Sequence, residues 1–282
     1  MQSSWLIAAF VVPALFIGNA GCQQNSVAPP STEQVGSLDS GAEDGGEGET
    51  DAGPATGRGF VILSTEPGAP TRVIAAFGNT DFPGRPSDAH RCLVEDRSEP
   101  VPEAGPYPAA ESAGQIDVTA GSRSATLKIL TEGGKVIGYS SADLSGGTSP
   151  LSPEVPIRVE AEGATVPAFE LEMLPTPEVE VTTSPAGGIT VGQPFEVRWP
   201  SSSAEYVAVW LDAGEVSIRC HAEASKGSLV VPSEHVAKVA AKAKDGVQLT
   251  IQASRTKSGR FGDFNVTLTH NARSTSVSLP LR

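Results

Sequence analysis

The sequence has few cationic residues and gathers them nowhere. It contains 20 Lys and Arg against 33 Asp and Glu, which gives a formal net charge of -13 over 282 residues. Proteins that bind nucleic acid place clustered Lys and Arg against the phosphate backbone. An acidic chain without such a cluster has no electrostatic basis for that role, so we expect no nucleic-acid partner.

Residues that hold metals or attack substrates are also scarce. No Gly-x-Ser-x-Gly nucleophile elbow occurs, and the serines gather in segments typical of turns, such as SSADLSGGTS. The histidines stand far apart, and none forms a metal-ligand pair with a cysteine; they are His90, His221, His235 and His270. We therefore expect no catalytic residues, no metal and no cofactor. An enzyme of unrecognised type is the distant alternative.

An uninterrupted apolar run lies near the N-terminus, from Trp5 to Ile17. It is shorter than the roughly 20 residues that span a bilayer, and it is typical of the apolar region of a secretory signal peptide. Small residues, Ala20 and Gly21, then precede Cys22, as a signal-peptidase pocket requires. Two alternatives remain open. A conventional signal peptide cut near Ala20 or Gly21 would leave Cys22 as a chance thiol, and a retained signal anchor would not be cut at all.

The next segment, residues 22 to 58, is polar and acidic. It is rich in Gly, Ser, Thr and Pro and has almost no large apolar side chains, so it cannot bury enough surface to offset backbone entropy. Residues 23 to 58 contain seven acidic residues and one basic residue, Arg58, and so carry -6 of the total charge. We expect a disordered acidic tether. A calcium loop is less favoured, because the acids lack the required spacing.

Residues 59 to 175 have the pattern of a first β-sandwich domain. Short runs of branched and aromatic residues alternate with polar ones between Pro- and Gly-rich turns. We expect about eight strands, which include the segments FVILSTE, RVIAAF, HRCLVED, GQIDVTAG, ATLKIL, VPIRVEAEG and AFELEML. In HRCLVED the alternation places Cys92 and Val94 on one face.

Residues 176 to 282 repeat this pattern as a second, immunoglobulin- or fibronectin-like sandwich. The expected strands are EVEVTTSP, PFEVRW, EYVAVWLDAG, VSIRCHAEA, GSLVVP, VQLTIQAS, FNVTLTH and TSVSLPL. Trp199 shares a face with Phe195 and Val197, so we expect it in the core. Only PSEHVAKVAAKA breaks the two-residue period. There we expect a short helix capped by Ser233 that buries a stripe of small apolar residues, Val236, Val239, Ala240 and Ala243.

Cys92 and Cys220 are the remaining cysteines, and they fall in the two different predicted domains. An oxidising compartment would permit a disulfide, but two lone cysteines in separate domains make a poor framework. We expect each to be a small buried hydrophobic side chain, with Cys220 buried and His221 on the opposite face. The sequence does not decide whether the two are free thiols.

Tyr206 and Trp210 are the candidate binding residues. Alternation places them opposite the face that carries Val207, Val209 and Leu211. Two aromatic side chains on the outside of a sheet favour a ligand-stacking strip, although such a pair can also cover a neighbouring strand or a seam between domains.

Two resemblances place the chain in the bacterial envelope. The stretch LFIGNAGCQQNS resembles a bacterial lipoprotein signal, which implies that Cys22 carries a diacylglyceride, and Gln23 after it favours the outer membrane in Gram-negative lipoproteins of this type. The stretches SAGQIDVTAG and VPAFELEMLPTP, with the order FEVRW, VAVWL and VSIRCHAEASKGSLVVPSEHV, resemble uncharacterised bacterial lipoproteins with tandem β-sandwich, immunoglobulin-like domains. This likeness supports architecture and location and carries no activity.

The sequence therefore predicts a cell-envelope lipoprotein that acts as a structural or binding module without catalysis. We expect the lipid on Cys22 to attach the protein to the membrane. Its other partner would be an envelope or extracellular protein or glycan. A carbohydrate- or protein-binding adhesin that uses the exposed aromatic face around Tyr206 and Trp210 is the alternative.

Overall fold

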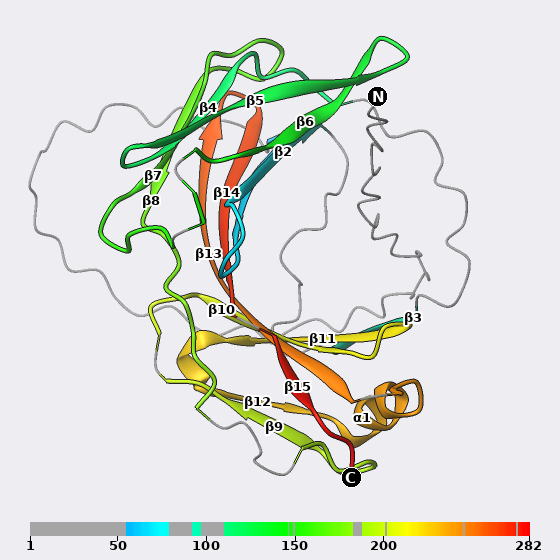
Figure 1. Ribbon diagram of the computed structural model, residues 1–282. Coiled ribbons are helices and arrows are strands. Elements are labelled where there is room, and N and C mark those ends of the chain that lie inside the picture. Colours follow the sequence, from blue (N-terminus) through cyan, green and yellow to red (C-terminus); the bar gives the residue numbers. More distant parts are fainter. Residues whose placement is uncertain are drawn as a thin grey trace, which may run out of the picture. The chain divides into compact units, whose positions relative to one another are not determined.

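The computed structural model describes residues 55–78, 92–96, 110–145, 147–148, 150–182, 188–200, 202–244, 246–274 and 276–282. The chain divides into two units, Met1–Pro54 and Ala55–Arg282, and the strands and helices described here belong to the second (Figure 1). The expected signal peptide, Cys22 and nearly all of the expected tether lie outside the described residues. The first strand begins at Gly57, two residues before the predicted domain boundary.

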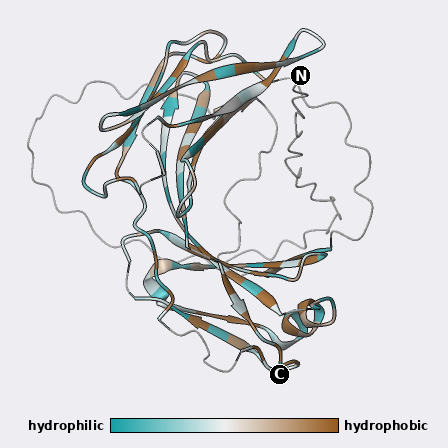
Figure 2. Ribbon diagram, in the orientation of Figure 1, coloured by the Kyte–Doolittle hydropathy of each residue, from teal (hydrophilic) through white to brown (hydrophobic). Residues whose placement is uncertain are grey.

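The described residues form an all-β protein, as predicted. Two short helices accompany the strands, α1 (Ser233–Ala240) and the 3-10 helix η1 (Ala224–Lys226). The strands are β1 (Gly57–Thr65), β2 (Arg72–Gly78), β3 (Cys92–Asp96), β4 (Ile116–Ala120), β5 (Arg123–Glu132), β6 (Lys135–Asp143), β7 (Ile157–Ala161), β8 (Phe169–Met173), β9 (Phe195–Arg198), β10 (Tyr206–Asp212), β11 (Val216–Glu223), β12 (Ser228–Val231), β13 (Val247–Phe261), β14 (Phe264–Arg273) and β15 (Val277–Leu279). Hydropathy changes along many of these strands, as one-sided burial requires (Figure 2).

One large sheet contains most of the strands. Its order is β3-β11-β10-β13-β14-β1-β2-β6-β5-β4-β7-β8, and β15 adds to β13. The sheet is mixed, because β1 runs parallel to β14 while its other neighbour, β2, is antiparallel. Strands β9 and β12 form a separate two-stranded sheet.

The first hydrophobic cluster contains side chains from the strands that lie between β14 and β8 in the sheet order. Strands that stand far apart in the sheet order meet there, so this part of the sheet curves. The ring of Phe169 in β8 lies 5.7 Å from that of Phe77 in β2 and 5.4 Å from that of Phe261 in β13. Tyr139 of β6 completes the group, edge-on to Phe77 at 5.8 Å.

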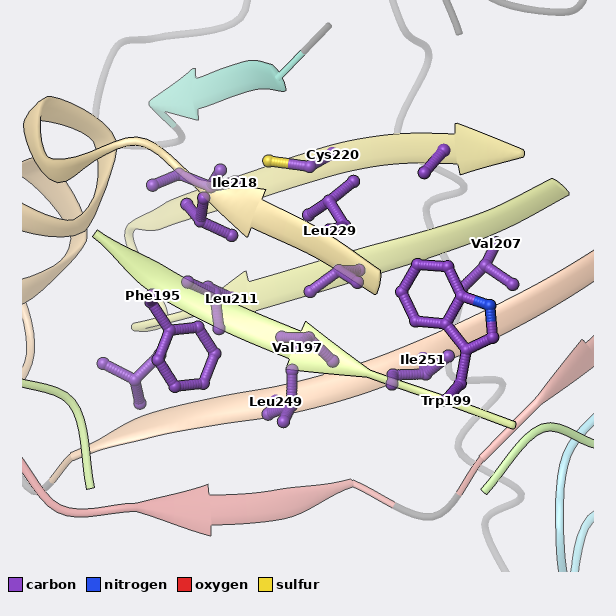
Figure 3. Packing of buried hydrophobic residues seen from close by; sticks show 14 of the residues in the cluster. Phe195, Val197, Trp199, Val207, Leu211, Ile218, Cys220, Leu229, Leu249 and Ile251 are labelled. Atoms are coloured by element: carbon purple, nitrogen blue, oxygen red, sulfur yellow. The ribbon is translucent and has the colours of Figure 1, made fainter. Parts of the chain in front are cut away.

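The second hydrophobic cluster is a sandwich of the small sheet against the other end of the large one. Phe195 and Val197 of β9 and Trp199 after it point into the cluster between the two sheets (Figure 3). Trp199 is only 3% exposed, and its indole Nε1 donates a hydrogen bond to the Ala224 carbonyl at 2.9 Å. The prediction of a core tryptophan is confirmed.

The hairpin of β13 and β14 serves both clusters. Leu249 and Ile251 of β13 belong to the second cluster, whereas Val266 and Leu268 of β14 belong to the first. The sequence predicted that FNVTLTH would close the second sheet, and this was wrong. Strand β14 pairs with β13 on one side and with β1, about 200 residues earlier in the chain, on the other, and it contributes to the first cluster because the hairpin extends well beyond the second.

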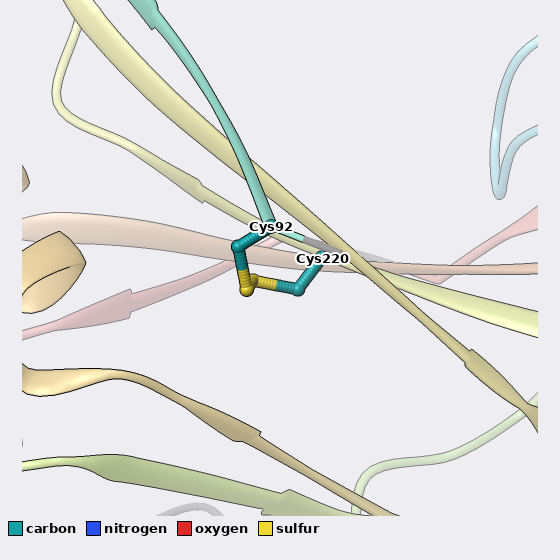
Figure 4. The surroundings of a disulfide bond; sticks show 2 residues. All are labelled: Cys92 and Cys220. Atoms are coloured by element: carbon teal, nitrogen blue, oxygen red, sulfur yellow. A yellow bond between two sulfur atoms is a disulfide. The ribbon is translucent and has the colours of Figure 1, made fainter. Parts of the chain in front are cut away.

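Strand β3 also crosses the predicted boundary. It pairs with β11 in antiparallel register, and Cys92 lies directly opposite Cys220. The two sulfurs form a disulfide between Cα atoms 4.0 Å apart (Figure 4). The expectation of two separate hydrophobic cysteines was therefore wrong, although Cys220 is fully buried as predicted. The disulfide joins residues 128 positions apart and fastens a segment of the first half to the second cluster.

Three further differences are local. Strand β6 was not predicted, and EVEV at residues 178 to 181 forms no strand, although Val179 is buried. Helix α1 is present, but its N-cap is Pro232 and Ser233 is its first residue. Val236 and Val239 are buried in it as expected, and Ala240 and Ala243 are half-buried. In the described part of the chain, no helix is long and apolar enough to cross a membrane.

Candidate binding face

The side of β3, β11, β10 and β13 that faces away from the second cluster is the outer face. Strand registers place its residues in rows that run across the strands. The rows are Glu95, Ser217, Asp212 and Gln248; then Leu93, Arg219, Trp210 and Thr250; then His221, Ala208, Gln252 and Arg273. Val207, Val209 and Leu211 point the other way and are fully buried, so the predicted alternation of β10 is confirmed.

The turn between β10 and β11 sets this register. Gly214 has a φ of 82°, which an L side chain rarely adopts, and its N–H donates to Asp212 Oδ1 at 2.7 Å. The Ala213 N–H closes the loop on the Val216 carbonyl at 2.9 Å. Because this turn fixes the pairing, Trp210 lies directly opposite Arg219.

Trp210 forms the centre of the outer face and is half-buried. The guanidinium carbons of Arg219 and Arg273 lie 5.0 and 5.4 Å from the centroid of its ring system. Both distances are typical of cation–π contacts. Arg273 is held by Gln252, whose side-chain oxygen accepts a hydrogen bond from Arg273 Nε at 3.2 Å. The sequence predicted an exposed aromatic strip, but the ring of Trp210 is covered by these two cations.

Polar atoms without partners gather on the outer face. Among the described residues, six buried side-chain atoms make no hydrogen bond, and five of the six belong to this face. They are Glu95 Oε1, Trp210 Nε1, Ser217 Oγ, Arg219 Nε and His221 Nε2. A buried polar atom without a partner costs about 1–3 kcal/mol, and native structures keep few of them. A concentration on one face therefore marks it as the candidate site.

His221 belongs to this group and is neutral at physiological pH. Burial, and secondarily the charge of Arg219, lower the pKa of its imidazole to about 4. A neutral imidazole offers one N–H donor and one acceptor nitrogen. The face consequently carries its positive charge on Arg219 and Arg273 alone.

The structure brings together only some of the residues that the sequence singled out. Tyr206 lies on the outer face, half-buried and one row beyond Ala208, opposite Glu223 and Ser254. Cys22 lies outside the described residues. Sequence reasoning missed Ser217 and Arg219 as site residues, although their alternation with Val216 and Ile218 already placed them on the outside. Glu95 could not be found, because its strand was assigned to the first domain.

A second polar cluster lies where β14 passes the segment after β8. His270 is 1% exposed, and its Nδ1 accepts a hydrogen bond from the Thr176 N–H at 2.7 Å. The Thr176 hydroxyl donates to the His270 carbonyl at 2.7 Å, and Thr65 Oγ1 lies 3.3 Å from Nε2. Opposite His270 on β13, Arg255 donates to the carbonyls of Leu174 and Pro175. These contacts hold the crossing segment to the hairpin.

We expect the stability of the protein to fall between about pH 6.5 and pH 4, with His270 contributing alongside His221. Burial, and then the charge of Arg255, lower the pKa of the His270 imidazole from 6.5 to about 4. As the pH falls, the imidazole is protonated in the unfolded chain before it is protonated in the folded protein. The contribution of His270 to stability is therefore fully present above the pKa of the unfolded chain and is lost as the pH falls to the pKa of the folded protein. The shift corresponds to about 3 kcal/mol.

Urea unfolding of the wild type and of His270→Asn at pH 7 and pH 4.5 measures this. Asparagine can still accept from the Thr176 N–H but does not titrate, so the variant should lose less stability on acidification. His235→Asn on α1 is the control for the replacement of an imidazole by an amide at another site. Equal pH slopes for the wild type and His270→Asn would contradict the prediction.

The described residues contain no cluster of three or more His, Cys, Asp or Glu side chains that could hold a metal ion. The outer face offers a ligand hydrogen-bonding groups, charges and an aromatic ring. No protein-family model matches this chain, and no curated protein matches it.

Proposed function

We propose that this protein is a lipoprotein of the bacterial outer membrane that binds an envelope or extracellular partner and has no catalytic activity. The lipid on Cys22 provides the anchor, and two immunoglobulin-like β-sandwich modules are built on the two clusters, of which the second presents the outer face. The disulfide supports an exported location, because disulfides persist in oxidising compartments and are rare in the cytosol.

The observation that carries the binding role is the gathering of partnerless polar atoms on the outer face. A stable fold satisfies its buried donors and acceptors, and exceptions concentrate where function requires them. Ser217 is the clearest case, since its side chain is 1% exposed and its hydroxyl has no partner. A bound ligand would supply the missing hydrogen bonds.

The anchor is tested by metabolic labelling with a fatty-acid probe. We expect the wild type to be labelled and to sediment with outer membranes, and Cys22→Ser to be unlabelled and released. The physical reason is that acyl chains stabilise membrane association by about 0.8 kcal/mol for each buried methylene. Cys92→Ser is the control and should remain labelled. Equal labelling of the wild type and Cys22→Ser would refute the anchor.

The binding role is tested with the full-length protein held in detergent micelles on a resin. Envelope extract is separated into protein, polysaccharide and lipid fractions, and each is passed over the wild type and over Trp210→Ala. We expect one fraction to be retained by the wild type and lost with the variant. Val230→Ala is the matched control, because Val230 is 54% exposed on β12, in the other sheet. Retention that Trp210→Ala leaves unchanged would exclude the outer face as the binding surface.

A further inference from the structure

We propose that the ligand of the outer face is an uncharged, hydroxyl-rich glycan chain. This inference rests on the proposed binding function and adds the chemistry of the partner. It follows from the kinds of atoms that lack partners, from the balance of charge on the face, and from the cover on Trp210.

The partnerless atoms include both donors and an acceptor. The indole N–H of Trp210 and the Nε–H of Arg219 can only donate, whereas Glu95 Oε1 is an acceptor. The Ser217 hydroxyl and the neutral His221 ring can do either. A ligand that satisfies this set must carry donors and acceptors close together. A sugar hydroxyl is both in one group, and neighbouring hydroxyls repeat the pattern along a glycan chain.

The charge on the face argues against an ionic ligand. Arg219 and Arg273 are flanked by carboxylates in the neighbouring rows, namely Glu95, Asp212 and Glu223. A polyanion would meet these three carboxylates, and a polycation would meet the two guanidinium groups. Neither could satisfy the donors and the acceptor together, so an uncharged ligand matches the face best.

The two guanidinium groups over the ring of Trp210 suggest how a glycan chain would bind. The guanidinium groups that lie over the ring belong to long side chains on half-buried residues. Rotation of Arg219 away from the ring would uncover an aromatic surface for a sugar ring and turn the arginine N–H groups towards its hydroxyls. Binding should therefore change the fluorescence of Trp210, while Trp199 stays in the core.

Two conservative substitutions separate this role from a structural one. Trp210→Phe keeps an aromatic ring, although a smaller one, and removes the N–H, and Ser217→Ala removes a hydroxyl that makes no hydrogen bond in the fold. Each should weaken glycan binding about tenfold, the value of one hydrogen bond. Ser217→Ala should at the same time raise the thermal midpoint by about 2–4 °C, because a buried partnerless group is removed. A hydroxyl with a structural role would give a lower midpoint.

The experiment measures binding of neutral glycans to the full-length protein in detergent micelles, by calorimetry and tryptophan fluorescence. The probes are cellohexaose, maltohexaose and chitohexaose, with hexagalacturonate as the anionic arm and a Ser/Gly-rich peptide as the peptide arm. Ser258→Ala is the matched control, since Ser258 lies on β13 outside the face and its hydroxyl already contacts that of Thr267 at 2.9 Å.

Saturable binding of a neutral glycan, weakened about tenfold in Trp210→Phe and in Ser217→Ala but unchanged in Ser258→Ala, supports the inference. Binding of no neutral glycan, or of only the anionic or peptide probe, overturns it. If envelope protein or lipid is still retained in a Trp210-dependent way, the proposed function stands and only the glycan is wrong. If Trp210→Ala does not affect retention of any fraction, the proposed function falls too.

Discussion

Breaking the disulfide between Cys92 and Cys220 is expected to lower the free energy of unfolding by about 4–5 kcal/mol. The bond closes a loop between residues 128 positions apart, and the loss of chain entropy that such a cross-link imposes on the unfolded state grows with loop length. Strand β3 has only five residues and one described neighbour, β11, so the bond also secures its pairing.

The measurement is urea unfolding of the oxidised wild type against Cys92→Ala/Cys220→Ala, followed by circular dichroism. Alkylation of the unfolded protein before and after reduction, with mass analysis, verifies that the bond is present. The variant with Cys22→Ser alone replaces a cysteine outside the disulfide, so it serves as the control and should unfold like the wild type. A difference below about 1 kcal/mol would show that the unfolded chain is already constrained in other ways.

Trp199→Ala is expected to cost about 3–5 kcal/mol of stability, the usual loss when a buried tryptophan is truncated. The indole lies between the two sheets of the second cluster, and its N–H holds the Ala224 carbonyl of η1. Truncation would leave a cavity and free that carbonyl. Such a loss is a large part of the 5–15 kcal/mol that stabilises a typical domain.

Trp210→Ala is the matched comparison and should cost about a third as much or less, since Trp210 is half-buried on the outer face and its N–H makes no hydrogen bond. Denaturant unfolding of the two full-length variants gives the ranking directly. A larger loss for Trp210→Ala would mean that the outer face is covered as firmly as the core. The case for a ligand on that face would then be lost.

Much of the second cluster could be predicted from the sequence because its strands alternate cleanly. PFEVRW and EYVAVWLDAG each gave the correct inward set. The alternation in these two strands is enough to place Trp199 on the buried face and Trp210 on the outer face. Two-residue alternation works here because one face of each strand is buried and the other is not.

Alternation does not reveal which strands are neighbours in a sheet. The main errors in the predicted strand pairing and domain assignment arise for this reason. HRCLVED gave the correct faces for Cys92 and Val94, but nothing in its pattern identifies β11 as its partner. The same holds for β14, which pairs with β1 across about 200 residues. For the same reason, the sequence did not predict the Cys92–Cys220 disulfide or the position of Glu95 on the outer face.

Strand β6 was missed for a different reason, since its pattern is broken. KVIGYSSAD pairs with β5 through a register shift at Leu130/Thr131 and with β2 through another at Val73/Ala75. Each bulge adds a residue to one strand and reverses the faces beyond it. Conversely, the alternating valines of EVEV suggested a strand where the chain only passes the second cluster and buries Val179.

The long β13–β14 hairpin also determines when folding can be completed. Strand β1 needs β14 as its parallel neighbour, and the second cluster needs the first half of β13, so both wait for residues 247 to 273. Contacts of such large sequence separation are formed slowly, typically in milliseconds to seconds for β-sheet proteins. A ribosome would therefore release most of this chain before either cluster could close, and the two clusters would acquire their final structure together rather than one after the other.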